Sequence, residues 1–150
     1  MSDRVFIDTN VLVYAHDTSA GRKHQIARGL IEQLWADRSG VLSTQVLQEL
    51  YVNVRRVAFN PIGADEARQL IEDYALWETI VNDGAAVLAA IDIEARFGIS
   101  FWDALIVHAA NTAGVETLFT EDLSHGQVYG GVLAVNPFIE GEAESSVHEP

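Results

Sequence analysis

Four acidic side chains stand where apolar runs are interrupted or end. They are Asp8 after Val5-Phe6-Ile7, Glu49 within Val46-Leu47-Gln48-Glu49-Leu50, Asp103 within Phe101-Trp102-Asp103-Ala104-Leu105, and Asp122 after Leu118-Phe119-Thr120-Glu121. A carboxylate in apolar surroundings is unfavourable unless its charge is compensated. If the fold brings the four together, a hard divalent cation, which takes oxygen ligands, relieves their repulsion most simply. A metal ion held by carboxylates with open coordination positions is suited to phosphodiester hydrolysis.

Asp8 and Asp103 each have a structural alternative to a role in chemistry. Asp8 could act only as the N-cap of the helix that follows it, while Thr9 and Asn10 either cap that helix or orient the carboxylate. Asp103 follows Ser100 by three residues, which is the spacing of a capping box. Capping and metal binding are compatible, because the two oxygens of one carboxylate can serve different partners. We therefore keep both residues as candidate metal ligands.

Glu49 and Asp122 also have alternatives. Glu49 lies at the border of the apolar arc of its predicted helix, a half-buried position that suits a carboxylate facing a cleft, although in isolation a solvated glutamate is the simpler reading. Asp122 falls in a turn-like segment in which Glu121 is a competing ligand. The hydroxyl of Thr120 could bind a metal-bound water or satisfy a backbone group. The sequence alone leaves the choice between Glu121 and Asp122 open.

The elements that must position these residues alternate between strand-like and helix-like segments. Short β-branched and aromatic runs predict strands at 4–7, 40–43, 77–81, 116–120 and 132–135. Apolar residues at helical spacing predict helices at 11–15, 22–37, 44–57, 64–74, 84–97 and 100–113. This alternation predicts an α/β fold with a mainly parallel sheet and helices on both faces. Because ligands bind at the carboxyl ends of such strands, Asp8 and Asp122 are expected at one edge, with helices delivering Glu49 and Asp103.

Composition points to a single globular domain. The chain has 150 residues, of which 49% are hydrophobic, and it contains no cysteine, so disulfides and thiol chemistry are excluded. We expect one domain over residues 1–139 and a disordered acidic tail over 140–150, which carries four glutamates. No apolar stretch reaches the roughly 18 residues of a membrane span, and no signal peptide is recognisable. We therefore expect a cytoplasmic protein without membrane association.

The charge balance is acidic. A formal charge of −13, from 22 acidic and 9 basic residues, argues against a broad basic surface for nucleic acid, although Arg22, Arg55 and Arg56 leave room for a local patch. Lys23 is the only lysine, and it lies far in sequence from all four acidic motifs, so the sequence offers no evident ammonium group to take the place of a metal cation. Phosphatases and phospho-aspartate receiver domains, which usually need a lysine after a later strand, are therefore disfavoured.

The motifs in combination carry a family resemblance. Asp8-Thr9-Asn10 after a strand, Glu49 in a helix, Phe101-Trp102-Asp103-Ala104-Leu105-Ile106, and the segment from Leu118 to Gly126 resemble the PIN-domain family, most closely its VapC-like toxin ribonucleases of prokaryotic toxin–antitoxin pairs. The resemblance covers about residues 4–138. It implies a PIN-like, Rossmann-like three-layer α/β/α fold with a short, mainly parallel sheet.

The same resemblance implies a function. Asp8, Glu49, Asp103 and Asp122 would form an acidic quartet that binds Mg²⁺ or Mn²⁺, and a metal-activated water would hydrolyse RNA. We expect Asp8 and Asp103 as direct ligands, with Glu49 and Asp122 holding metal-bound waters or a second ion. The implied partners are an RNA substrate, a cognate antitoxin protein and a second copy in a homodimer. The alternative is a catalytically silent PIN-like module that only binds a partner.

Overall fold

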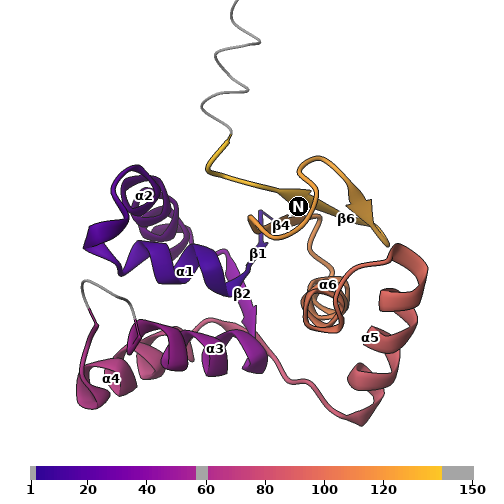
Figure 1. The fold of residues 1–150 in the computed structure, drawn as a ribbon, viewed down its shortest axis with the longest axis horizontal. Helices are drawn as coiled ribbons and strands as arrows, with labels where there is room; N and C mark the ends of the chain where they lie inside the picture. Colours follow the sequence, from indigo (N-terminus) through magenta and orange to yellow (C-terminus); the bar gives the residue numbers. More distant parts are fainter. Residues whose placement is uncertain (1–2, 57–60, 140–150) are drawn as a thin grey trace, which may run out of the picture.

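The computed structural model describes residues 3–56 and 61–139, which are built around a six-stranded sheet (Figure 1). The strands lie in the order β3 (Glu78–Ile80), β2 (Gly40–Ser43), β1 (Val5–Ile7), β4 (Thr117–Phe119), β6 (Val132–Val135) and β5 (Val128–Tyr129). Every neighbouring pair is parallel except β5 with β6, which is antiparallel. The predicted mainly parallel sheet is confirmed.

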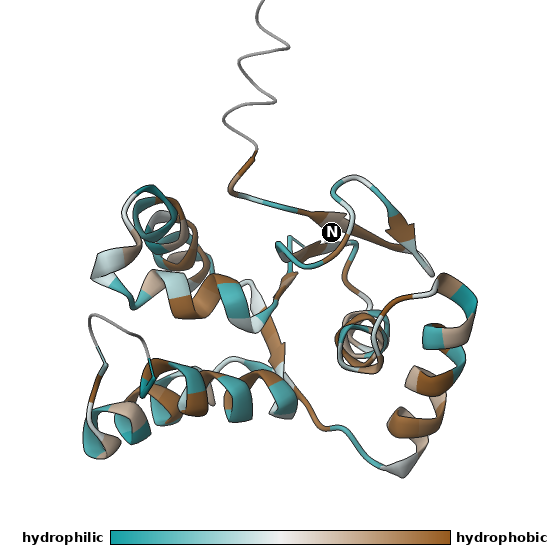
Figure 2. Cartoon of the chain, in the orientation of Figure 1, coloured by the Kyte–Doolittle hydropathy of each residue, from teal (hydrophilic) through white to brown (hydrophobic). Residues whose placement is uncertain are grey.

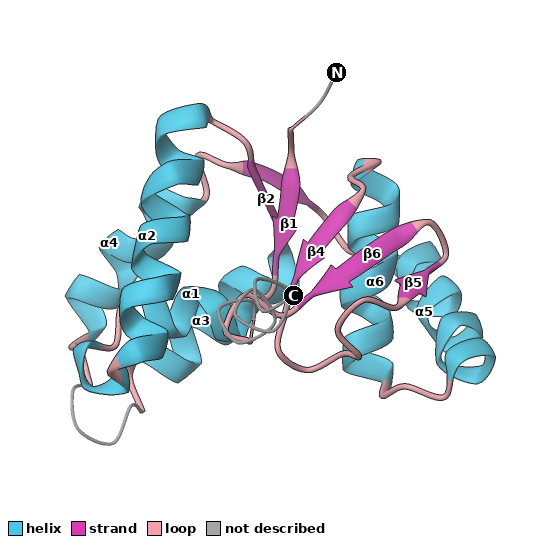
Figure 3. Ribbon diagram, turned by 90° about the horizontal axis from the view of Figure 1, so that it is seen from above, coloured by secondary structure: helices cyan, strands magenta, loops and turns pink. Residues whose placement is uncertain are grey.

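Helices cover both sides of this sheet. They are α1 (Thr9–Ala15), α2 (Arg22–Asp37), α3 (Thr44–Val54), α4 (Ala64–Tyr74), α5 (Gly84–Phe97) and α6 (Phe101–Ala113). Figures 1 and 3 show α1 to α4 on one side of the strands and α5 with α6 on the other. The chain therefore has the three-layer α/β/α arrangement that the alternation of segments predicts.

The core explains why the central strands read as continuous apolar runs. Neighbouring residues of a strand face opposite sides of the sheet, and both Phe6 and Ile7 of β1 are fully buried, as are Val41 and Leu42 of β2. Figure 2 shows apolar colouring on these central strands. Helix α6 is apolar around most of its circumference because it packs between the sheet and α5.

The structure departs from the predicted elements in several places. Helix α1 begins at Thr9 instead of residue 11, because Asp8 caps it, and three strands are shorter than predicted. Strand β5 and the 3₁₀ conformation of Thr18–Ala20 were not predicted, since two or three residues carry no readable periodicity. Helix α3 ends at Val54 instead of residue 57, because the N–H of Arg56 bonds to the carbonyl of Asn53 and the chain turns out of the helix. Val57 and the predicted tail over 140–150 lie outside the described residues.

No helix formed by the described residues has both the length and the apolar character that a bilayer span requires.

Candidate active site

The pairing of β1 with β4 places the first two site residues side by side. Ile7 lies opposite Phe119 in this parallel pair, so Asp8 and Thr120 leave the sheet at the same edge. The N–H of Asp8 donates to the carbonyl of Phe119 at 3.0 Å, which extends the ladder by one residue. The Thr120 hydroxyl donates to Oδ2 of Asp8 at 2.7 Å. Asp8 is consequently fixed in a buried position, with 4% of its surface exposed.

Asp122 is held beside Asp8 by hydrogen bonds to its backbone and its side chain. Its N–H donates to Oγ1 of Thr120 at 3.0 Å, and its Oδ2 accepts from Nδ2 of Asn10 at 2.9 Å. Asn10 belongs to the first turn of α1, where the N–H of Thr9 donates to Oδ1 of Asp8 at 2.7 Å. Asp8 thus caps α1 and faces the acidic cluster at once, so the structural and the chemical readings of this residue are both compatible with the fold.

Asp103 reaches the same place from the first turn of α6. Ser100 caps this helix by accepting from the N–H of Asp103 at 3.0 Å, as the capping-box spacing predicts. The buried Gln45 of α3 donates from Nε2 to the carbonyl of Trp102 at 3.2 Å. This bond connects the beginning of α6 to α3, and it fixes where the Asp103 carboxylate enters the site.

Three of the four predicted acids meet closely. One carboxylate oxygen from each of Asp8, Asp103 and Asp122 lies within 4.8 Å of the other two. Two unit charges at such a separation repel by about 3 kcal/mol at an effective dielectric of about 20. The donors are all carboxylate oxygens, the type that hard dications such as Mg²⁺ and Mn²⁺ prefer. The residues present therefore fit a hard divalent cation.

The electrostatics of the cluster agree with this fit. Burial raises the pKa of Asp8 from 3.8 to about 7, although hydrogen bonds from Thr120 and Thr9 lower it, and the charges of Asp122 and Glu49 raise it further. Burial likewise raises the pKa of Asp103, with smaller contributions from the same two charges. These carboxylates resist ionisation because they are buried and because their negative charges repel one another. A dication stabilises their charged form.

Glu49 lies in the same cleft but outside the close cluster. Its Oε1 accepts from the Thr9 hydroxyl at 2.7 Å, and its Oε2 accepts from Nε2 of Gln45 at 3.2 Å. Both oxygens are thus engaged by neighbouring side chains from α1 and α3. The half-buried position predicted for Glu49 agrees with its intermediate exposure.

The acids open onto a cleft of about 610 Å³. Its lining includes Trp102, 62% of whose surface is exposed, and Arg56, a base that follows α3. The cleft therefore combines an acidic cluster with an exposed indole and a guanidinium group. This is a suitable combination for a ligand that carries both a phosphate and an aromatic base.

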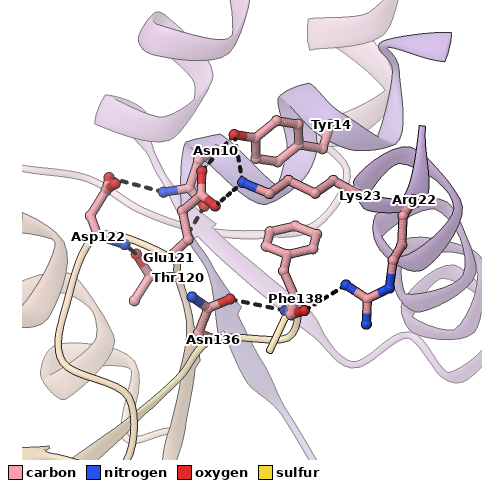
Figure 4. Close-up of polar contacts among 9 residues, drawn as sticks. All are labelled: Asn10, Tyr14, Arg22, Lys23, Thr120, Glu121, Asp122, Asn136 and Phe138. Carbon is pink, nitrogen blue, oxygen red and sulfur yellow. Dashed lines mark hydrogen bonds and ion pairs between the residues drawn. The ribbon is translucent and has the colours of Figure 1, made fainter. Parts of the chain in front are cut away.

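Glu121 points away from the acidic cluster. Its Oε2 lies 2.7 Å from Nζ of Lys23 on α2, and its Oε1 accepts from the hydroxyl of Tyr14 at 2.6 Å (Figure 4). Asp122, and not Glu121, is therefore the member of the close group. The fold carries Lys23 to the residue next to Asp122, but the ion pair that its ammonium group forms among the described residues is with Glu121, not with one of the four predicted acids.

Several residues of the site were missed by sequence reasoning. Lys23 and Tyr14 act through contacts spanning about a hundred residues, and no local pattern marks them. Gln45 is one turn before Glu49, and its burial in the cleft could have been suspected from that spacing alone. The sequence showed the basic pair Arg55-Arg56, but the direction in which the Arg56 side chain points depends on where α3 ends.

Comparisons with known proteins agree on the fold. The PIN domain family model matches residues 5–131. Similar solved structures include a toxin–antitoxin complex from Klebsiella pneumoniae, with a TM-score of 0.64, 17% identity, and coverage of 89% of this chain and 97% of that one. Another is DNA-bound VapBC from Salmonella typhimurium, with a TM-score of 0.63, 17% identity, and coverage of 91% and 99%.

A third is VapC20 from Mycobacterium tuberculosis, described as a sarcin-ricin loop cleaving toxin, with a TM-score of 0.58, 17% identity, and coverage of 76% of this chain and 86% of that one. Comparison with curated proteins gives no significant match. At such identities the structural likeness speaks for the fold, whereas the family match spans well over half of the chain. The chain belongs to the PIN domain family.

Proposed function

We propose that this protein is a divalent-metal-dependent endoribonuclease and the VapC-like toxin of a toxin–antitoxin pair. The observation that carries the proposal is the convergence of Asp8, Asp103 and Asp122 within 4.8 Å in an open cleft. Membership of the PIN domain family and the toxins among the similar structures support it.

The chain's own residues divide the work. Asp8 and Asp103 would hold the cation directly, and Asp122, which lies beside Asp8, would complete the group. Glu49 has both oxygens bonded to protein donors, so it serves as an oriented acceptor for water entering the cleft. A bound Mg²⁺ or Mn²⁺ supplies positive charge to the scissile phosphate and makes an attacking water more acidic. Thr120 and Thr9 hold the carboxylates in the orientation that this requires.

RNA is the proposed substrate despite the acidic net charge. Binding at the cleft requires only local complementarity, which Arg56 offers to a phosphate and Trp102 offers to a base. The nine basic residues provide few backbone contacts. We therefore propose that a short stretch of single-stranded RNA around the cut site makes most of the contacts, and that the affinity for RNA falls only slightly as the salt concentration rises.

A protein antitoxin and a second copy are the proposed partners. Antitoxin complexes among the similar structures support the first. Helix α5 supports the second, since Val87, Leu88 and Ile91 on it are exposed by 41%, 67% and 46%. We assign this α5 surface to the homodimer. A catalytically silent partner-binding module, the alternative, gives no reason for three carboxylates to converge in a cleft.

Incubation with RNA tests the proposal. Purified protein with Mg²⁺ or Mn²⁺ should cut RNA, leave 5′-phosphate and 3′-hydroxyl ends, and lose activity in EDTA. Asp8→Asn and Asp103→Asn should abolish cleavage and cation binding measured by calorimetry. Asp65→Asn, the same change at an exposed site on α4, is the matched control and should retain both. Full activity of Asp8→Asn, or undiminished cleavage in EDTA, would overturn the assignment.

A further inference from the structure

Two adjacent acids after β4 point in different directions. Asp122 turns into the acidic cluster, whereas the neighbouring Glu121 reaches toward α1 and α2 (Figure 4). The side chain of Asn10 bonds to both acidic residues. Its Oδ1 accepts from the backbone N–H of Glu121 at 3.4 Å, and its Nδ2 donates to the carboxylate of Asp122 at 2.9 Å. Asn10 and Tyr14 are four residues apart on α1 and so lie on one face of that helix. One face of α1 therefore holds both acids.

Lys23 is held in place by more than its ion pair. Its Nζ lies 4.9 Å from the ring centre of Tyr14 and 5.5 Å from that of Phe138. Phe138 is itself fixed, because its carbonyl accepts from Arg22 at 2.8 Å and its N–H donates to Asn136 at 2.9 Å. An ammonium group placed over two aromatic rings loses less freedom when it pairs with a carboxylate. The Lys23–Glu121 pair is thus better ordered than an isolated surface pair.

The pair also decides the charge near the cation site. Lys23 neutralises Glu121, which otherwise adds a further carboxylate charge near the cluster of Asp8, Asp103 and Asp122. A free Glu121 is also a competing oxygen ligand one residue from Asp122. Anchoring Glu121 outside the cluster therefore removes that competitor and fixes the backbone that carries Asp122.

We propose that Lys23 and Tyr14 are positioning residues, which act through Glu121 to hold Asp122 ready for the cation. The inference rests on the proposed metal-dependent function. Without the anchor, the 121–122 segment has to be ordered when the cation binds, and this ordering weakens binding. Neither residue is assigned contact with the cation or with the substrate.

The test removes the ion pair without changing the net charge. Lys23→Met combined with Glu121→Gln deletes one positive and one negative group; glutamine keeps the length of glutamate, and methionine is one atom shorter than lysine. Mn²⁺ binding, measured by calorimetry on the full chain, should weaken by roughly three- to tenfold. The Mn²⁺ concentration for half-maximal cleavage should rise by the same factor, while KM for RNA stays unchanged. Tyr14→Phe, which removes only the second donor to Glu121, should act in the same direction with a smaller factor.

Matched variants separate positioning from general destabilisation. Arg28→Met with Glu32→Gln removes an exposed ion pair on the same helix, α2, and should leave Mn²⁺ affinity unchanged. The single variant Lys23→Arg should keep the Mn²⁺ affinity within about twofold of wild type, because a guanidinium also pairs with a carboxylate. Thermal unfolding in EDTA reports the stability of the fold independently of the cation.

The outcomes are distinguishable. Weakened Mn²⁺ affinity of the double variant, with control and Lys23→Arg near wild type, supports the proposal. Unchanged affinity overturns it and leaves the nuclease function standing. A lower unfolding temperature in EDTA with unchanged affinity also overturns it, since the ion pair would then be only structural. Absence of Mn²⁺ binding by the wild-type protein overturns both this inference and the proposed function.

Discussion

The hydroxyl of Thr120 and the carboxylate of Asp8 are joined by a 2.7 Å hydrogen bond between the ends of two neighbouring parallel strands. The same Thr120 oxygen accepts from the N–H of Asp122 at 3.0 Å. A single hydroxyl therefore connects two of the three acids that converge, and it favours the charged form of Asp8.

Thr120→Val keeps the shape of this fully buried side chain and removes its hydroxyl. We expect the pKa of Asp8 to rise further, because a hydrogen bond that favours its carboxylate is lost. Mn²⁺ affinity at neutral pH should fall by roughly tenfold, as for other residues that orient metal ligands. Calorimetry at several pH values measures this, and the loss should shrink as the pH rises. An affinity equal to that of wild type at pH 7 would contradict the role of the hydroxyl.

Asp8 should make stability in EDTA depend on pH. Its folded-state pKa of about 7 exceeds the ordinary 3.8, so the folded protein binds this proton more tightly than the unfolded chain does. The resulting stabilisation is complete below about pH 3.8 and is lost as the pH rises through about 7. Over that range, wild type should lose up to about 4 kcal/mol of unfolding free energy relative to Asp8→Asn. Urea unfolding of both proteins provides the comparison, and parallel pH profiles would refute the expectation.

Asp122→Asn and Glu49→Gln should differ in their effect on cation binding. Asp122 contributes an oxygen to the close group, whereas both oxygens of Glu49 are already bonded to Thr9 and Gln45. Asp122→Asn should weaken Mn²⁺ affinity by at least roughly tenfold. Glu49→Gln should lower kcat with a smaller change in affinity. Equal losses of affinity in the two variants would place Glu49 among the direct ligands.

Trp102 and Arg56 should contribute to RNA binding more than to cation binding. Trp102→Ala removes an exposed stacking surface, and Arg56→Ala removes a cation that lines the cleft. We expect KM for a short single-stranded RNA to rise by roughly five- to fiftyfold for Trp102→Ala, with Mn²⁺ affinity unchanged. Leu76→Ala, at a side chain that is 80% exposed and outside the lining of this cleft, is the control. Unchanged KM in both cleft variants would move the substrate contacts elsewhere.

The α5 surface should mediate self-association. Leu88→Asp places a charge at the centre of the exposed apolar side chains of α5 and should convert a dimer to a monomer at micromolar concentration. Sedimentation velocity measures the mass, and Leu76→Asp, a change at a side chain exposed by 80%, serves as the comparison. A wild-type protein that sediments only as a monomer would remove the basis for the homodimer.

Local sequence was sufficient to locate most of the elements. The helix predicted at 84–97 is observed with those bounds, because Asp83 caps its beginning and Gly98 ends it in the left-handed conformation at φ 66°. The helices at 22–37 and 64–74 and the strand at 40–43 were likewise predicted with the observed bounds. Strand β5 escaped prediction because its two residues are defined only by their pairing with β6.

The sequence by itself determined that Asp8 and Asp122 come just after strands, because hydrophobic period and capping chemistry are encoded within a few residues. Only the tertiary structure decided that Asp122 joins Asp8 and Asp103 while Glu121 turns to Lys23. The two acids are neighbours with the same chemistry, so no local pattern separates them. Their directions depend on the β1–β4 register and on where α1 and α2 cross the edge of the sheet, and both are set by packing across the whole domain.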